Sequence, residues 1–386
     1  MKKILLINTK YREFGGEDSN FIEEYDFLSK NYEVDCIEFE NKGRIKFSDL
    51  IAFVLNNNFI SNKKVINKIN EFKPDFVYIH NTWFRGNLGL FSILKRTGIP
   101  VVHKIHNFRF DCTSSYFSQA HLNGKKFCEK CGYSNKSRIL NKYFNESLLK
   151  SIAVIWYGKK YLRILKTYNM KILVMTNFQK KYLLEIGVNP KNIYIFENPI
   201  KIDPILKVSY DSSSNYIIYA GRISFEKGLE QLIESWIDSD VKGLVLKVVG
   251  TGSYLESLKK QFQTTKLEFL GQIPNEEVVE LIKKSRAVVT ATRMYEGQPK
   301  FLCEASIYGI PAIFPSFGGM IEFYQNDYQL KFEQYNYSDL INKFNLLENK
   351  QIMKKTSADV SNFITQKLSE KSLNNKFKEI IKNFDE

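Results

Sequence analysis

Short apolar runs alternate with amphipathic stretches along almost the whole chain. In the first half the apolar runs predict strands, and the stretches between them repeat their apolar positions at helical spacing. The predicted strands are Lys3–Asn8, Glu33–Phe39, Asp75–His80, Val101–Ile105, Ile172–Thr176 and Ile193–Glu197, and predicted helices include Asp18–Lys30, Leu88–Thr97 and Asn177–Ile186. Such a strand–helix–strand repeat predicts parallel crossovers, and therefore an α/β fold with a doubly wound sheet.

The same rhythm starts again in the second half. Strands are predicted at Tyr216–Ala220, Leu244–Val249, Leu267–Leu270, Ala287–Ala291 and Ala312–Pro315, and helices at Leu229–Ile237, Tyr254–Phe262, Glu276–Lys284 and Phe301–Tyr308. Residues 198–215 lack periodicity and contain prolines and a serine run, which predicts a hinge. We therefore predict two Rossmann-like domains, 1–200 and 201–365, and a helical tail, 366–386, that can pack back on the first domain. Ligands are expected in a cleft at the carboxyl ends of the strands.

Composition agrees with a two-domain soluble protein. At 386 residues the chain exceeds what one hydrophobic core usually organises, and 44% hydrophobic and 25% charged residues are ordinary values. The apolar run Ile4–Ile7 is too short for a secretory signal or a membrane span. Five cysteines without an export signal predict reduced thiols, and hence a cytoplasmic protein. Such a protein can also act at the inner face of the cell membrane.

The net charge of +14 is unevenly distributed. Residues 1–200 contain 32 Lys and Arg against 18 Asp and Glu, whereas residues 201–386 contain 24 of each. This asymmetry favours an anionic surface or acceptor for the first half, and a solvated lysine-rich surface is the alternative. The positive net charge by itself would also suggest a nucleic-acid-binding protein. No recognised nucleic-acid-binding module is visible, so no nucleic-acid partner is predicted.

Residues 147–168 read as a basic amphipathic helix. Leu148, Ile152, Ile155 and Leu162 are its apolar positions, Lys159, Arg163 and Lys166 are its cations, and Trp156 and Tyr157 lie at the boundary. Such a helix can lie on an anionic membrane or can be an ordinary core helix with a solvated basic face. Gly158 argues against one continuous helix, because glycine costs a helix interior about 1 kcal/mol relative to alanine.

Candidate chemistry follows the strands of the second half. Glu296 and Glu304 flank a turn after a strand, and carboxylates there can accept hydrogen bonds from sugar hydroxyls while the helix start faces an anion. Arg222 and Lys227, after the strand Tyr216–Ala220, can converge on a diphosphate and stabilise a nucleotide leaving group without Mg²⁺. Gly250, after another strand, allows close backbone approach to a nucleotide. Asp238-Ser239-Asp240 is interpreted as a loop away from the strand ends.

In the first half, Gly15 and Gly16 end the loop after the first strand. Paired glycines let backbone amides approach the phosphate or sugar of a ligand, although a flexible turn is an equal reading. No complete G-x-G-x-x-G motif is present, which argues against a dinucleotide fold. His106 follows another strand, in the run HNFR.

These motifs together resemble the retaining glycosyltransferases of family 4, which have the GT-B fold, over nearly the whole chain and most strongly from Ile218 to Gly319. The motif G-R-x-x-x-E-K-G corresponds to residues 221–228, and E-x-x-x-x-x-x-x-E corresponds to residues 296–304. The resemblance implies that Arg222 and Lys227 hold the donor diphosphate, that Glu296 contacts the transferred sugar and that Glu304 contacts the ribose. Gln298 and Lys300 depart from the usual residues of the motif.

The resemblance implies further roles in donor and acceptor binding. Backbone amides near Pro299, Lys300 and Phe301 are implied to touch sugar or phosphate oxygens, and His106 is implied to face the transferred sugar. Gln298 and the three glycines Gly15, Gly16 and Gly250 complete the predicted donor-binding residues. The implied catalytic residues are His106, Glu296, Arg222 and Lys227, and Arg109 is a candidate for acceptor binding. The run EGQPKFLCEASIYGIPAIFPSFGG is similar to the branch that builds capsules and other surface polysaccharides.

Cys112, Cys128 and Cys131 form C-x15-C-x2-C, which supplies three of the four ligands of a structural zinc site. His103, His106 and His121 are not at convincing spacing for the fourth. Bound zinc and free or locally structural thiols therefore both stay open, and the thiols are favoured.

The resulting prediction is a metal-independent hexosyltransferase. It would need no cofactor, use a UDP- or GDP-sugar as donor, and transfer the sugar with retention to a glycan or an undecaprenyl diphosphate-linked acceptor, in peripheral contact with an anionic membrane. A nucleotide-sugar epimerase or a phosphorylase on the same fold is the alternative within enzymes.

Overall fold

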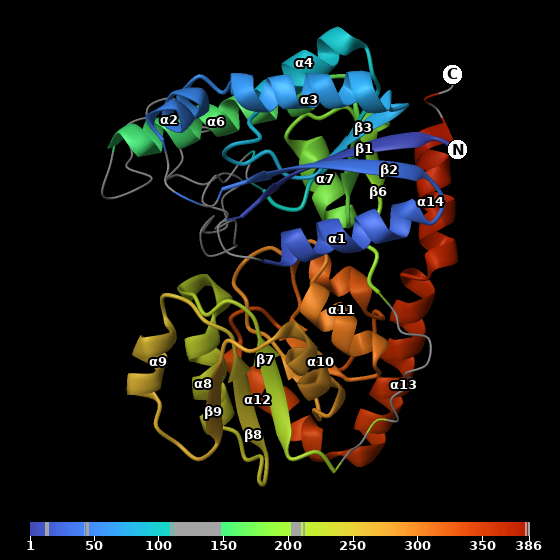
Figure 1. Cartoon of the computed structure of the whole chain (residues 1–386). Coiled ribbons are helices and arrows are strands. Elements are labelled where there is room, and N and C mark those ends of the chain that lie inside the picture. Colours follow the sequence, from blue (N-terminus) through green and yellow to red (C-terminus); the bar gives the residue numbers. More distant parts are fainter. Residues whose placement is uncertain are drawn as a thin grey trace. The chain divides into compact units, whose positions relative to one another are not determined.

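The computed structural model describes residues 1–11, 15–41, 43, 46–108, 110, 148–201, 210, 213–382 and 384. The chain divides into two compact units (Figure 1). Unit 1 comprises Met1–Pro199 and Leu373–Glu386, and unit 2 comprises Ile200–Ser372. The end of the chain therefore returns to the first unit.

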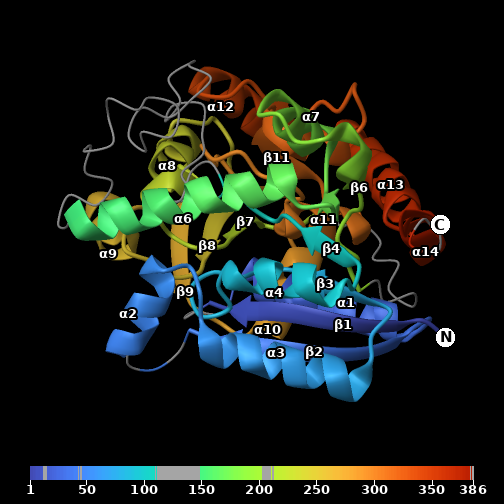
Figure 2. The same cartoon turned by 90° about the horizontal axis from the view of Figure 1, so that it is seen from above.

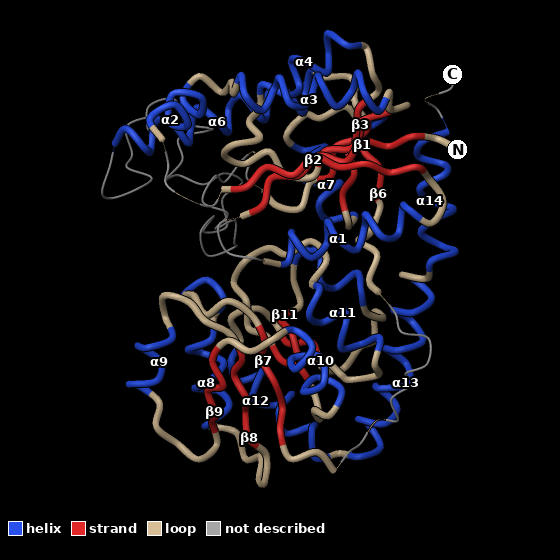
Figure 3. The backbone as a smooth tube through the Cα atoms, viewed as in Figure 1, coloured by secondary structure: helices blue, strands red, loops and turns tan. Residues whose placement is uncertain are grey.

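Unit 1 is built on a parallel sheet with the strand order β2-β1-β3-β4-β5-β6, and Figure 3 draws its strands in red among the blue helices. Its strands are β1 (Lys3–Lys10), β2 (Glu33–Glu40), β3 (Phe76–Ile79), β4 (Val101–Lys104), β5 (Lys171–Val174) and β6 (Ile193–Ile195). Ile4 to Ile7 are fully buried. An unbroken apolar run of this kind is typical of a parallel strand covered by helices on both faces. The covering helices are α1 (Gly16–Ser29), α3 (Phe59–Phe72), α4 (Gly89–Thr97), α6 (Leu148–Thr167) and α7 (Asn177–Glu185).

Helix α14 (Glu370–Lys382) completes the core of unit 1. Leu373, Phe377, Ile380 and Ile381 recur at i, i+4, i+7 and i+8, and all four are buried in one cluster with residues of β1 and β3. Beside them, the ammonium of Lys376 donates to the Glu197 carboxylate at 2.7 and 2.8 Å.

Unit 2 contains a second parallel sheet, with the strand order β12-β11-β10-β7-β8-β9. Its strands are β7 (Tyr216–Ala220), β8 (Val245–Val249), β9 (Leu267–Gly271), β10 (Val288–Val289), β11 (Ala312–Pro315) and β12 (Lys331–Phe332). Its helices are α8 (Leu229–Ile237), α9 (Leu255–Gln261), α10 (Asn275–Lys283), α11 (Lys300–Ile307), α12 (Tyr337–Asn345) and α13 (Lys350–Lys367). The predicted α/β fold with two doubly wound sheets is confirmed.

Each sheet has a point at which the strand order reverses. In unit 1 this point lies between β1 and β3, and in unit 2 it lies between β7 and β10. Loops that leave neighbouring strands toward opposite faces open a crevice at their carboxyl ends, where ligands of doubly wound folds bind. The reversal points therefore mark where functional side chains are expected.

Helix α6 corrects the prediction made for residues 147–168. It is continuous from Leu148 to Thr167 despite Gly158, which lies on the buried side, where tertiary packing offsets the low helix propensity of glycine. The buried face carries Val154, Tyr157, Tyr161 and Leu165, at i, i+3, i+7 and i+11. Ile152 and Trp156, by contrast, are exposed.

Candidate functional site

The candidate residues of unit 2 meet at its reversal point. β7 and β10 pair directly, with Ile218 opposite Val288, so the loops that leave their carboxyl ends are neighbours. The first loop carries Arg222 and Lys227, and the second carries Glu296 and leads into α11. The fold thus brings together two motifs that lie about seventy positions apart in the sequence.

Lys227 and Glu296 form the central contact between these loops. The Lys227 ammonium donates to Glu296 Oε1 at 2.5 Å, and the two side chains are 23% and 28% exposed. Arg222 donates to Glu226 Oε1 at 3.0 Å, and its side chain is 61% exposed. Both cations therefore lie at the surface of unit 2, each held by a carboxylate.

The backbone around Lys227 is fixed by a close approach between the loops. Gly228 has φ of +65°, and a Cβ atom at this position would lie 2.1 Å from the carbonyl oxygen of Ala291. Only glycine fits there without moving the β10 loop. The same glycine ends the 3-10 turn Phe225–Lys227 and begins α8, so it fixes where the Lys227 side chain starts.

Helix α11 begins at Lys300, with Pro299 at its N-cap. The first N–H groups of a helix have no intrahelical acceptor and attract anions. Lys300 and Glu304 approach to 3.7 Å across one helical turn. Gln298 is buried and Phe301 is half-buried, so the predicted donor-lining residues differ in accessibility.

Gly250 has a structural reason to be glycine. Its φ is +132°, and a Cβ atom would lie 2.0 Å from the carbonyl oxygen of Gly221. Its N–H donates to the carbonyl of Gly271 at 2.7 Å. The packing of the loops after β7 and β8 therefore requires glycine here, and contact of Gly250 with a donor stays a prediction.

Gly15 and Gly16 begin α1 beside the reversal point of unit 1. A Cβ atom at either position would meet nothing within 4 Å, so internal packing does not require glycine there. Asp18 accepts a hydrogen bond from the Gly15 N–H at 3.1 Å and fixes the start of the helix. The open space above both residues is compatible with the predicted ligand contact, which stays a prediction.

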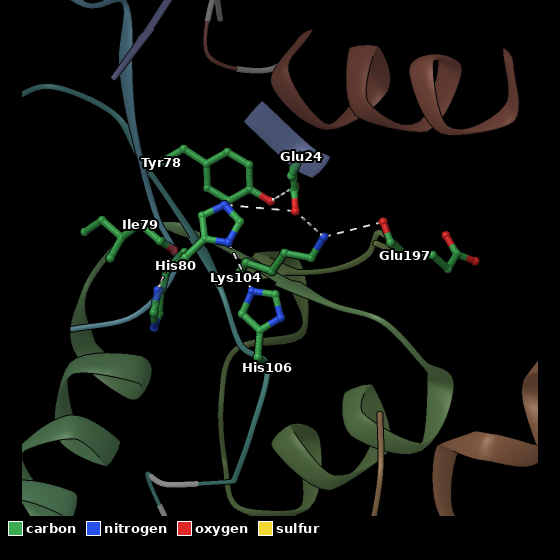
Figure 4. Close-up of polar contacts among 8 residues, drawn as sticks. Glu24, Tyr78, Ile79, His80, Lys104, His106 and Glu197 are labelled. Atoms are coloured by element: carbon green, nitrogen blue, oxygen red, sulfur yellow. Dashed lines mark hydrogen bonds and ion pairs between the residues drawn. The ribbon is translucent and has the colours of Figure 1, made fainter. Parts of the chain in front are cut away.

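His106 lines a small pocket in unit 1, and Figure 4 shows its ring beside that of His80. One side of its ring is held by His80, whose Nδ1 lies 3.1 Å from His106 Nε2. The other nitrogen, His106 Nδ1, is buried and has no hydrogen-bond partner among the described residues. The pocket is lined by Glu17, His80, Asn81, Thr82, Lys104, His106, Asn107, Tyr157 and Tyr161.

Behind His80 lies a buried charged cluster that the sequence did not point to. Glu24 accepts hydrogen bonds from Lys104 Nζ at 2.8 Å and from the Tyr78 hydroxyl at 2.5 Å, and all three residues are fully buried (Figure 4). Lys104 Nζ also lies 3.4 Å from the backbone oxygen of Glu197. A buried ion pair with additional hydrogen bonds is the arrangement in which such charges are tolerated.

The position of the Glu24 carboxylate indicates which ring nitrogen of His80 and of His106 carries the proton. His80 Nε2 lies 4.0 Å from Glu24 Oε2, and the negative carboxylate favours an N–H on that nitrogen. His80 Nδ1 then accepts a hydrogen bond from His106 Nε2–H. His106 Nδ1 is consequently left unprotonated and can accept a hydrogen bond from a hydroxyl in the pocket.

Burial keeps these histidines neutral. It lowers the pKa of His106 well below its ordinary value of 6.5, and the neighbouring His80 and Lys104 lower it further. Burial also lowers the pKa of His80, and the neighbouring Lys104 ammonium lowers it further. The pKa of Lys104 is also lowered by burial, although Glu24 opposes that shift. His106 is therefore suited to accept a hydrogen bond near neutral pH.

The remaining predicted residues, including the cysteines of the candidate zinc site, are not described by the structure. Arg109, Cys112, Cys128 and Cys131 lie outside the described residues. Within the described residues, no group of three or more His, Cys, Asp or Glu side chains is arranged to hold a metal ion. Whether the cysteines bind zinc stays an open prediction.

Known proteins resemble the chain in sequence and in fold. Residues 206–367 match the family of glycosyl transferases group 1. The amylovoran biosynthesis glycosyltransferase AmsD of Erwinia amylovora is 29% identical over 150 residues, which cover 37% of this chain and 42% of that protein. The O-antigen biosynthesis glycosyltransferase WbnH of Escherichia coli is 28% identical over 186 residues, which cover 46% of this chain and 50% of that protein. The chain thus spans about half the length of these curated relatives.

The crystal structure of HepE from Anabaena in complex with UDP and glucose superposes with a TM-score of 0.68 at 14% identity, covering 99% of this chain and 100% of that one. This similarity confirms the predicted GT-B fold. The region that matches glycosyl transferases group 1 lies within the second unit of this GT-B architecture.

Proposed function

We propose that this protein is a glycosyltransferase that moves a sugar from a nucleotide diphosphate-sugar to a glycan or lipid-linked acceptor. The match of residues 206–367 to glycosyl transferases group 1 supports the reaction class. Two relatives are named for amylovoran and O-antigen biosynthesis, which supports a role in a bacterial capsule, exopolysaccharide or lipopolysaccharide. The similar HepE structure holds UDP and glucose, which favours a UDP-sugar over a GDP-sugar.

The observation that carries the proposal is the contact between Lys227 and Glu296 at the reversal point of unit 2. In this contact, the cation proposed to bind the diphosphate lies beside the carboxylate proposed to bind a sugar hydroxyl, which supports a shared donor site. Arg222, held by Glu226 at 3.0 Å, adds a second cation on the same loop. A planar guanidinium and an ammonium together match the diphosphate of a nucleotide-sugar.

The proposed reaction uses these groups to stabilise the departing nucleotide. The bond between the sugar anomeric carbon and the diphosphate oxygen breaks, and its electron pair stays on that oxygen. Lys227 and Arg222 stabilise the developing negative charge, so that no metal ion is needed for this purpose. The acceptor hydroxyl attacks the anomeric carbon from the side of the leaving group, its proton passes to the leaving phosphate, and the configuration is retained.

The other predicted residues orient the donor. Glu296 accepts a hydrogen bond from a hydroxyl of the transferred sugar, and Glu304 accepts from the ribose hydroxyls. The N–H groups at the start of α11, near Pro299, Lys300 and Phe301, bind sugar or phosphate oxygens. When the donor binds, its diphosphate partly replaces the Glu296 carboxylate as the partner of Lys227. This exchange is feasible because both side chains are partly exposed.

Unit 1 is proposed to bind the acceptor and to contact the transferred sugar. His106 Nδ1, neutral and unpartnered in its pocket, accepts a hydrogen bond from a sugar hydroxyl. The excess of cations in the first half favours an anionic acceptor. An undecaprenyl diphosphate-linked glycan has this charge, and it would bring the protein to the cytoplasmic face of the cell membrane.

A thermal-shift panel with UDP, GDP, ADP and their sugars, with and without EDTA, tests the donor class. We expect one nucleotide to stabilise the protein and EDTA to leave the shift unchanged. No shift with any nucleotide would contradict the proposal. Product analysis then separates the enzyme classes, because turnover without acceptor indicates an epimerase and turnover that needs inorganic phosphate indicates a phosphorylase.

A further inference from the structure

Helix α2 (Phe47–Val54) presents its apolar stripe outward. Phe47, Leu50, Ile51 and Val54 recur at i, i+3, i+4 and i+7, the spacing that normally faces a protein core, yet all four are exposed and Phe47 is 77% exposed. The buried large residue of α2 is Phe53, on the opposite side, which stacks on Tyr157 of α6 at 5.5 Å between ring centroids. The exposed stripe is therefore a candidate face for an apolar partner.

The apolar stripe continues onto the neighbouring elements. Leu55 follows α2, and Phe59 and Ile60 at the start of α3 are 75% and 80% exposed. On α6, positions i, i+3 and i+7 are Leu149, Ile152 and Trp156, and all three are exposed. We call this set the apolar surface; it comprises Phe47, Leu50, Ile51, Val54, Leu55, Phe59, Ile60, Leu149, Ile152 and Trp156.

The elements that carry the apolar surface are packed together. Phe53 of α2 stacks on Tyr157 of α6. In addition, Lys160 Nζ of α6 donates a hydrogen bond of 3.0 Å to the backbone oxygen of Asn56, which lies in the turn between α2 and α3. Figures 1 and 2 both place α2 beside α6 at one end of unit 1. This many exposed apolar residues on elements that pack together indicate an interaction site.

The charges around the apolar surface are mostly positive. Lys63 and Lys64 on α3, and Arg163 and Lys166 on α6, are exposed. The acidic residues on the three helices are Asp49 and Glu71. Asp49 is bound to Arg85 at 3.0 Å, and Glu71 lies 3.8 Å from Lys68. Apolar and aromatic side chains bordered by exposed cations are the composition of segments that lie in the interface of an anionic bilayer.

We infer that the apolar surface docks unit 1 on a membrane that contains anionic lipid. A second copy of the chain is disfavoured as the partner, because its own cations would meet these cations. No helix among the described residues has the length and apolarity to cross a bilayer, so docking in the interface is the mode that the structure supports. The inference rests on the proposed function only in that a lipid-linked acceptor would be reached at this surface.

Vesicle cosedimentation of the full chain tests the inference. We expect binding to phosphatidylcholine vesicles that contain phosphatidylglycerol, weaker binding to phosphatidylcholine alone, and release by salt. The double variant Leu50→Glu/Val54→Glu should bind at least about tenfold more weakly. Leu184→Glu is the matched control, because Leu184 is an exposed leucine of unit 1 on α7, outside the apolar surface. It should bind as the wild type does.

A fluorescence titration reports the same contact at one residue. The chain has three tryptophans, and Trp156 belongs to the apolar surface. Vesicles should shift the emission of the wild type to shorter wavelength, and Trp156→Phe should abolish that shift without loss of vesicle binding. Absence of vesicle binding in the wild type, or unchanged binding of Leu50→Glu/Val54→Glu, would overturn the inference. Concentration-dependent dimerisation lost in that double variant would also overturn it, in favour of a second copy.

Failure of the inference can be separated from failure of the proposed function. The double variant should keep the thermal shift with nucleotide and the transfer of sugar to a soluble acceptor without lipid. Nucleotide binding by a wild-type protein that does not bind vesicles would contradict the membrane-docking inference alone. Vesicle binding by a protein that no nucleotide stabilises would contradict the proposed glycosyltransferase function alone.

Discussion

The two units hold their charged residues in opposite ways. In unit 1, Glu24 and Lys104 are fully buried and are joined to Tyr78 and, through His80, to His106. In unit 2, two ion pairs keep contact with solvent: Lys227 with Glu296, where both side chains are partly exposed, and Arg222 with Glu226, where the cation is exposed. A buried pair has no water to replace a lost partner, whereas an exposed pair can exchange one partner for a ligand.

This difference suggests a division of labour. The buried cluster holds a neutral imidazole in one orientation, because each of its members is fixed by a neighbour. The exposed pairs keep cations in place for an anion without binding them so tightly that a diphosphate cannot displace the carboxylate. The comparison therefore predicts that substitutions in unit 1 act first on stability and that substitutions in unit 2 act first on activity.

The largest effect is expected from breaking the buried pair. Lys104→Met leaves the Glu24 carboxylate buried without its cation, and the free energy of unfolding should fall by about 3–5 kcal/mol. Urea denaturation measures the loss. Lys3→Met is the control, because the pair of Lys3 with Glu33 is solvent-exposed and should be worth less than about 1 kcal/mol. The double variant Glu24→Gln/Lys104→Met should lose less than the sum of the single variants. Equal losses for Lys104→Met and Lys3→Met would remove the distinction between the units.

Removing the partly exposed cation Lys227 should act on catalysis. Lys227→Ala should lower kcat/KM for sugar transfer by about 10²–10³-fold, because it removes charge stabilisation of the leaving diphosphate. The free energy of unfolding should change by no more than about 1 kcal/mol, because the pair is partly exposed. Lys247→Ala is the matched control in the same unit, since Lys247 is similarly exposed and approaches Glu268 at 3.7 Å. A normal transfer rate in Lys227→Ala would contradict the proposed donor site.

Acid should destabilise unit 1 through its buried histidines. Burial lowers the pKa of His103 from 6.5 to about 4. Between these values the unfolded chain binds a proton that folded His103 does not, so the free energy of unfolding is highest above about pH 6.5 and falls as the pH drops toward about 4. The contribution of His103 is on the order of 3 kcal/mol. Urea denaturation across this pH range measures the slope, and His103→Gln should reduce it. An unchanged slope in that variant would assign the acid sensitivity to other groups.

The smallest effect is expected from His80, which positions His106 without touching the reacting atoms. His80→Gln should lower kcat by about tenfold, less than the loss of a directly acting side chain. Because His80 contributes to lowering the pKa of His106, its removal should raise that pKa and move the acid limb of the pH–rate profile to higher pH. A merely structural role would lower the rate without moving that limb. Lys3→Met is the control, because Lys3 pairs with Glu33 at the surface and does not act on the pKa of His106, so it should leave the limb in place.

Much of this protein could be predicted from its sequence alone. The strands Tyr216–Ala220 and Ala312–Pro315 begin and end where their apolar runs do. Other predicted elements, such as Glu33–Phe39 and Leu267–Leu270, are correct to within a residue or two. Periodicity is a direct consequence of backbone geometry, so it can be read without knowing what packs where. The motif residues Lys227 and Glu296 were likewise visible, because their chemistry and their place after strands are local features.

Only the tertiary structure decided which residues are buried and which of them meet. Helical spacing puts Glu24, with Phe21 and Leu28, on the apolar face of α1, but nothing local indicates that its buried partner is Lys104. The apolar stripe of α2 would be taken for a core face, yet it points outward because Phe53, on the other side, packs on α6. Burial depends on segments distant in sequence: Glu24 meets its cation eighty positions away, and no local pattern contains that information.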